Sequence, residues 1–117
     1  MPIRNSPYDF TKSTKIITLF DQLQFTGYNE YFILNNTGKM DAVLNHAESG
    51  RKISLKTTMP GLLFYTGDYL NGKYQKNQGI CLETQLFPDA PNHENFPSAL
   101  LVPSQTFFHE TILKMSW

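Results

Sequence analysis

The sequence predicts an all-β protein built as an antiparallel β-sandwich. Short stretches rich in Thr, Ile, Phe and Tyr recur along the whole chain, and turn-forming residues separate them. No stretch of about twelve or more residues keeps the apolar period of a helix. With 117 residues the chain has the length of one domain or of a piece of one. We therefore expect a single all-β segment over residues 1–117.

Eight stretches have the composition of strands, and their regular spacing favours an antiparallel sandwich or barrel. Glycine, proline and asparagine lie in the gaps, and Asn71-Gly72 favours the left-handed backbone of a tight hairpin turn. The expected strands are Lys15–Phe20, Tyr31–Leu34, Ala42–Asn45, Lys52–Thr57, Leu62–Thr66, Gly79–Phe87, Ala99–Val102 and Thr106–Met115.

The longest irregular segment runs from Pro88 to Pro97 and contains three prolines. Proline has no N–H to donate to a strand ladder, so we expect a loop over one end of the sheets. Two interpretations stay open on composition alone. The segment is either a plain connection or a stiffened loop that contributes to a site.

Alternation along Gly79–Phe87 places Glu83 on one face of a strand. The apolar face carries Ile80, Leu82, Thr84 and Leu86. The other face carries Cys81, Glu83, Gln85 and Phe87. One interpretation of Glu83 is a solvated glutamate on an exposed strand face. The other is a carboxylate held in a cleft as a general base, with Gln85 as a neighbouring hydrogen-bonding group. The spacing leaves both open.

Charge and composition exclude several classes of partner. Ten basic residues balance ten acidic ones, which gives no electrostatic reason to expect nucleic acid or an anionic membrane surface. The apolar runs are shorter than the ~20 residues that cross a bilayer. The N-terminus lacks the apolar core of a signal peptide. The single cysteine, Cys81, has no partner for an internal disulfide. We expect a cytoplasmic protein with no membrane or nucleic-acid partner.

The histidines give no indication of a metal site. His46, His93 and His109 are far apart in sequence, and they show no metal-ligand spacing with one another or with Cys81. We expect no metal. No phosphate-binding glycine loop or nucleophile elbow is present either.

Two blocks of the sequence are distinctive: Gly79–Gln85 with the loop Phe87–Ser98 behind it, and Thr57–Asp68. Both resemble the C-terminal part of the aldose 1-epimerase (galactose mutarotase) family. Further segments fall in the family's order: Pro7–Phe10, Gly27-Tyr28 and Ser49–Arg51. The resemblance covers essentially the whole chain, and it is collinear only with the family's C-terminal part.

The resemblance implies the C-terminal portion of a galactose mutarotase-like super-sandwich. It also implies a reaction that interconverts the α and β anomers of a free hexose such as galactose or glucose. A general base removes the proton of the anomeric hydroxyl while a general acid protonates the ring oxygen, so the ring opens and closes again. By match to the family motif Glu83 is the base. No metal or organic cofactor is implied, because both steps are proton transfers.

Three departures from the family pattern limit what the chain is expected to do alone. The general-acid histidine of the family belongs to the N-terminal region that has no counterpart here. After Gly27-Tyr28 the family usually shows aspartate and then histidine, whereas this chain has Asn29 and Glu30. Asn29 keeps a carbonyl acceptor for a sugar hydroxyl but loses the charge. Leu63 stands where some members place a sugar-contacting glutamine.

Three hypotheses follow for this molecule. The chain is an aldose 1-epimerase, a non-catalytic carbohydrate-binding relative, or a truncated fragment that needs the missing N-terminal part. A cut sandwich leaves strand edges and apolar faces uncovered, and 40% of the residues are hydrophobic. We therefore expect self-association or pairing with a complementary N-terminal segment.

Overall fold

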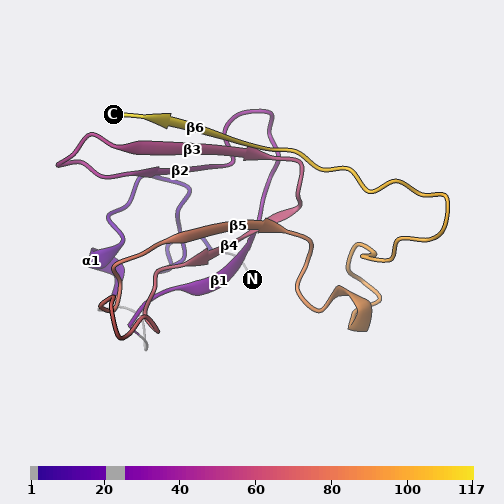
Figure 1. Cartoon of the computed structure of the whole chain (residues 1–117), viewed down its shortest axis with the longest axis horizontal. Coiled ribbons are helices and arrows are strands. Elements are labelled where there is room, and N and C mark those ends of the chain that lie inside the picture. The colour runs from indigo at the N-terminus through magenta and orange to yellow at the C-terminus, as the bar shows by residue number, and fades with distance from the viewer. Residues whose placement is uncertain (1–2, 21–25) are drawn as a thin grey trace. The chain divides into compact units, whose positions relative to one another are not determined.

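The computed structural model describes residues 3–20 and 26–117 (Figure 1). These residues form two compact units, each described here by itself. Unit 1 contains the described residues up to Asn29 together with Tyr65–Cys81, and unit 2 contains Glu30–Phe64 and Leu82–Trp117. Six strands and only two short helices occur in the described part of the chain. The all-β prediction is confirmed.

The first sheet of unit 2 has the order β2-β3-β6, with both pairs antiparallel (Figure 1). Its strands are β2 (Ala42–Asn45), β3 (Lys52–Thr57) and β6 (Thr111–Ser116). Leu55 on the central strand pairs with Ala42 on one side and Leu113 on the other. Its side chain is 1% exposed. The central strand β3, which has a neighbour on each side, therefore carries one of the core residues of this sheet.

The second sheet has the order β1-β4-β5. Its strands are β1 (Asn29–Ile33), β4 (Gly61–Tyr65) and β5 (Cys81–Gln85). On β4, Leu62 and Phe64 are buried, whereas Leu63 and Tyr65 are half-buried, which is the alternation of a strand with one core face. Phe32 packs near Phe64 with ring centroids 6.4 Å apart. These residues form the inner face of the sheet.

Tyr31 crosses the opposite, outer face of this sheet above Gly61. Its hydroxyl donates a hydrogen bond to the backbone carbonyl of Gln85 at 3.2 Å. Its ring meets Phe87 edge-on at 5.5 Å between centroids. A Cβ on residue 61 would overlap the Tyr31 ring and hydroxyl, so β4 must begin with glycine. Burial of the Tyr31 hydroxyl raises its pKa.

Unit 1 is organised around Tyr28, whose side chain is fully buried. Its hydroxyl donates to the Pro7 carbonyl at 2.6 Å, and its N–H donates to the Thr66 hydroxyl at 2.8 Å. The Thr66 N–H in turn donates to the Tyr28 carbonyl at 3.0 Å. Three further aromatic rings surround it: Tyr8, Phe10 and Phe20. Burial is the main reason why the pKa of Tyr28 rises to about 12, and Tyr8 adds to it.

Two of the eight predicted strands are wrong. Lys15–Phe20 contains a short helix, α1 (Ile17–Phe20), because Thr18 turns back and donates both its N–H and its hydroxyl to the Lys15 carbonyl. Ala99–Val102 pairs with no described strand. Its backbone instead turns, with the Gln105 N–H donating to the Val102 carbonyl, and Pro103 follows without an N–H to donate.

The other predicted strands are found, two of them with the predicted bounds. Ala42–Asn45 and Lys52–Thr57 match β2 and β3 residue for residue. The segment Thr106–Met115 forms a strand only from Thr111. Asn71-Gly72 lies in the long connection between β4 and β5, where Gly72 has a φ of 68°, and not in a tight hairpin. No described helix is long and apolar enough to cross a membrane.

Gly61→Ala should lower the free energy of unfolding by about 1–3 kcal/mol, the usual cost of forcing extra volume into a packed site. The new methyl group displaces the Tyr31 ring and breaks its bond to the Gln85 carbonyl. Urea unfolding measures the loss. Gly79→Ala is the matched control, because its Cβ would meet only Leu70 at an ordinary 3.5 Å. Equal stability of the two variants would contradict this packing.

Tyr28 should make the free energy of unfolding fall between pH 10 and 12. Its pKa in the folded chain is about 12 against an ordinary value of 10, so the protonated hydroxyl stabilises the fold fully below pH 10. That contribution is lost as the pH rises through 12. Tyr28→Phe should be less stable than the parent at pH 8, and the difference should shrink by pH 12. Denaturant unfolding at several pH values tests this, and a constant difference would contradict it.

Candidate functional site

Glu83 is the central residue of β5. Its neighbours Leu82 and Thr84 are half-buried, and the Thr84 hydroxyl lies 3.0 Å from that of Thr111 on β6. Alternation therefore directs Glu83 away from the β2-β3-β6 sheet, onto the outer face. Its side chain is exposed, and no hydrogen bond or ion pair from the described residues reaches its carboxylate. The strand and the face both agree with the sequence prediction.

The outer face of the β1-β4-β5 sheet presents a mixed surface around Glu83. Leu63 of β4 is half-buried, and because it follows Gly61 by two residues it lies on the same face of the strand. Tyr31 lies over that face at Gly61. Phe87 follows β5 and meets the Tyr31 ring. Glu83 therefore shares a sheet face with the aromatic rings of Tyr31 and Phe87 and with the aliphatic side chain of Leu63. Such a face offers apolar surface beside a free carboxylate, which suits a ligand with both C–H and hydroxyl groups.

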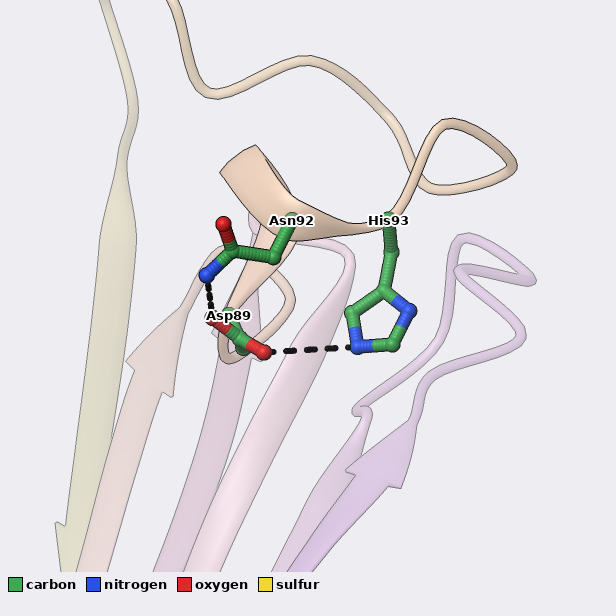
Figure 2. Close-up of polar contacts among 3 residues, drawn as sticks. All are labelled: Asp89, Asn92 and His93. Atoms are coloured by element: carbon green, nitrogen blue, oxygen red, sulfur yellow. Dashed lines mark hydrogen bonds and ion pairs between the residues drawn. The ribbon is translucent and has the colours of Figure 1, made fainter.

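The segment predicted as a loop, Pro88–Pro97, is irregular apart from one short 3₁₀-helix, η1 (Ala90–Asn92). Asp89 precedes it with a φ of 58°, in the left-handed region that aspartate tolerates better than most residues. One oxygen of its carboxylate accepts from the Asn92 side-chain amide, and the other lies 3.4 Å from Nε2 of His93 (Figure 2). Asp89 thus holds Asn92 and His93 on either side of its carboxylate.

A series of contacts between aromatic rings connects this loop to β5. Phe87 meets Phe96 edge-on at 5.1 Å, and Phe96 lies 4.6 Å from the His93 ring. The loop also borders an open hollow of about 490 Å³. The hollow is lined by Ala90, Pro91, His93, Glu94, Phe96, Ser98, Ala99 and Leu100. Glu83 is not part of this lining, so the hollow and the carboxylate are separate features of unit 2.

Asn29, the predicted sugar contact, begins β1 and is exposed. It follows Gly27 and Tyr28, which are both buried in unit 1. A Cβ on Gly27 would lie 2.8 Å from Cβ of Asp68, so the backbone that leads to Asn29 approaches its neighbours closely. Asn29 belongs to unit 1 and Glu83 to unit 2. Their roles as a pair therefore stay a prediction.

The histidines occupy three unrelated positions. His46 shares a hydrogen bond with the Ser49 hydroxyl at 2.9 Å in the turn after β2. His93 belongs to the loop, and His109 is exposed beside Phe107. Although the sequence predicts a strand from Thr106, β6 begins two residues after His109. Within the described ranges no three His, Cys, Asp or Glu residues gather as metal ligands do.

Sequence reasoning missed Tyr31 and Asp68. The sequence predicts only a strand at Tyr31, because nothing in a local pattern shows that Gly61 leaves room for its ring. Asp68 is buried in unit 1, and its Oδ1 has no hydrogen-bond partner in the described structure. Glycine followed by aspartate is typical of an exposed turn, so the local pattern does not indicate that Asp68 is buried.

The fold is that of a β-sandwich protein, and the outer face of its β1-β4-β5 sheet presents an exposed carboxylate. The family model for aldose 1-epimerase matches residues 1–114, and the chain belongs to the aldose 1-epimerase family. The predicted resemblance is therefore confirmed.

Similar curated proteins come from animals and bacteria. The chain is 36% identical to mouse galactose mutarotase over 125 residues, which covers 98% of this chain and 36% of that protein. It is 34% identical to human galactose mutarotase with the same coverage. For the aldose 1-epimerase of Escherichia coli the identity is 34%, over 81% of this chain and 32% of that protein. The chain thus spans about a third of the length of these relatives.

One solved structure supports the predicted fold. A GalM/aldose epimerase homologue from C. elegans superposes with a TM-score of 0.89 and covers 97% of this chain. The chain covers 38% of that protein, and the identity is 20%. This likeness confirms the sheet architecture and adds nothing about activity.

Replacing Asp89 should separate its backbone role from its side-chain role. Asp89→Ala should cost about 1–2 kcal/mol more than Asp89→Gly, because only alanine must hold a Cβ in the left-handed region. Both variants lose the carboxylate that contacts Asn92 and His93. Urea unfolding of the two variants gives the difference directly. If Asp89→Ala were as stable as Asp89→Gly, the left-handed backbone at residue 89 would be wrong.

Proposed function

We propose that this chain carries the general-base half of an aldose 1-epimerase site, acting on a free hexose such as galactose or glucose. The observation that carries the proposal is the carboxylate of Glu83. It is exposed on β5, and it accepts no hydrogen bond from a described residue. A carboxylate without a protein partner keeps its lone pairs available for a substrate proton. Membership of the aldose 1-epimerase family supports the assignment.

The proposed chemistry is two coupled proton transfers. Glu83 accepts the proton of the anomeric hydroxyl, and electron density moves into the C1–O1 bond as the bond from C1 to the ring oxygen breaks. A general acid delivers a proton to that ring oxygen. The open aldehyde rotates about its bond to C2, and closure on its other face returns both protons. Positioned acid–base groups contribute about 10²–10⁴-fold each. No step needs a metal or an organic cofactor.

The chain by itself supplies one of the two groups. The general-acid histidine that the family resemblance implies has no counterpart here, and we propose that a complementary N-terminal segment provides it. Asn29 is the proposed hydroxyl contact, through its side-chain carbonyl. The exposed, unpaired thiol of Cys81 supports a reducing compartment, and we propose the cytoplasm.

A second candidate function is carbohydrate binding without catalysis. Leu63, half-buried on the face that Glu83 occupies, favours it, because an aliphatic side chain there offers packing and no polar contact. Binding without turnover would then be the property of the chain alone. A sugar titration followed by NMR, with polarimetry on the same sample, separates the two functions.

Polarimetry should show no acceleration of hexose mutarotation by the 117-residue chain alone. Activity should appear when the chain is mixed with the portion of mouse galactose mutarotase that it does not cover. In that mixture Glu83→Gln should lower the rate by about 10²–10⁴-fold, since an amide does not accept the hydroxyl proton. Glu48→Gln is the matched control, an exposed carboxylate in the turn between β2 and β3.

Two results would contradict the proposal. Near-normal turnover of the Glu83→Gln mixture would remove Glu83 as the base. Robust catalysis by the unmixed chain would show that a residue within it supplies the acid.

A further inference from the structure

The outer edge of β6 is an open strand edge that the proposed activity does not use. In the order β2-β3-β6 the strand pairs with β3 on one side, and no described strand pairs with its other side. All six residues of β6 are exposed, and Trp117 after it is 92% exposed. A strand in this position presents a row of unpaired backbone groups to other chains.

The hydrogen bonds of Glu110 show which groups point outward. Its carbonyl accepts from the Thr58 N–H at 3.0 Å, and its N–H donates to the Thr58 hydroxyl at 2.9 Å, so both groups face the β3 side. In an antiparallel ladder this direction repeats at every second residue. Ile112 and Lys114 therefore face β3, whereas the N–H and C=O groups of Thr111, Leu113 and Met115 point to the free edge.

The contact between Thr57 and Thr111 supports this assignment. The two residues are register partners, and their hydroxyl groups lie 2.9 Å apart. Paired residues come closest where they do not exchange backbone bonds, because Cα atoms there are about 4.5 Å apart and not 5.5 Å. Thr111 thus belongs to the set whose backbone groups β3 leaves free.

β6 is better suited to pairing than β2, the opposite edge of the sheet. Ile112, Leu113 and Met115 are 48%, 52% and 63% exposed, so the edge carries apolar side chains on both faces. β2 has only four residues, and Asp41 directly before it binds the Thr57 N–H through its carboxylate. A short strand beside a charge is a common way to block edge pairing.

We propose that β6 is a self-pairing edge, at which a second copy of this chain adds antiparallel across a two-fold axis centred on Ile112. In this register Thr111 of each copy lies opposite Leu113 of the other. Each such pair exchanges two N–H···O=C bonds through the groups that β3 leaves free. The two sheets become one continuous sheet, and Glu110 of each copy lies opposite Lys114 of the other.

Charge complementarity favours a second copy of this chain as the partner, and it favours the register centred on Ile112. A lysine on an edge strand normally opposes pairing, because it meets an apolar or a like-charged neighbour. With Ile112 at the centre, each Lys114 meets a Glu110 of opposite charge, and the two-fold axis repeats the contact. Centring on Leu113 instead places Lys114 against Ile112 and leaves both charges unmatched. The chain carries no net charge that would keep two copies apart.

A charge-swap series tests this pairing in solution. Light scattering after size-exclusion chromatography should show a dimer of the 117-residue chain whose population rises with concentration. Lys114→Glu and Glu110→Lys should each raise the dimer dissociation constant about tenfold, since two attractive cross-strand pairs become repulsive. The double variant should return to within about threefold of the parent. Lys76→Glu, in the connection before β5, is the control and should change nothing.

Hydrogen exchange gives a readout that does not depend on the variants. The Leu113 N–H should become protected as the dimer forms, while the Ile112 N–H, bonded to β3, should be protected at every concentration. A concentration-independent monomer would overturn the proposal, and so would a double variant no tighter than the single ones. So would protection of Leu113 that appears only when the uncovered portion of mouse galactose mutarotase is added, because the occupant would then be that segment.

Discussion

The hydrogen bond from the Tyr31 hydroxyl to the Gln85 carbonyl is the contact on which the architecture around the site depends. It requires glycine at residue 61, because a Cβ there would overlap the Tyr31 ring and hydroxyl. The same ring contacts the ring of Phe87. Phe87 in turn contacts Phe96, and Phe96 contacts the His93 ring. One tyrosine therefore couples the end of β5 to the loop that follows. Its partner on the chain is a backbone atom, so the contact survives most changes of side chain at residue 85.

The position of Glu83 follows from this arrangement and from strand alternation. β5 directs Thr84 toward Thr111 of β6, and the next residue back must then face outward. As the proposed base, Glu83 keeps a fixed direction on its strand while its carboxylate stays free of partners among the described residues. This is what acid–base catalysis on a neutral sugar needs, since a carboxylate already engaged in strong hydrogen bonds accepts a substrate proton less readily.

Local patterns predicted what depends on local chemistry. The strands β2 and β3 and the outward face of Glu83 follow from alternation and turn residues. The strand expected at Ala99–Val102 failed because apolar composition does not tell whether a partner strand exists. Lys15–Phe20 failed because the Thr18 hydroxyl gave the backbone a local bond. The room above Gly61 and the buried carboxylate of Asp68 arise from residues distant in sequence, so no local pattern contains them.

The central claim is that Glu83 acts as a base through its carboxylate, and chemical rescue tests it most directly. The sample is Glu83→Ala, mixed with the portion of mouse galactose mutarotase that the chain does not cover, and NMR exchange spectroscopy follows the two anomers of galactose. The account predicts a slow rate that rises in proportion to added formate, whose carboxylate fits the vacated space. The parent mixture should not respond to formate. A Glu83→Ala rate equal to that of the parent, or one indifferent to formate, would contradict the account.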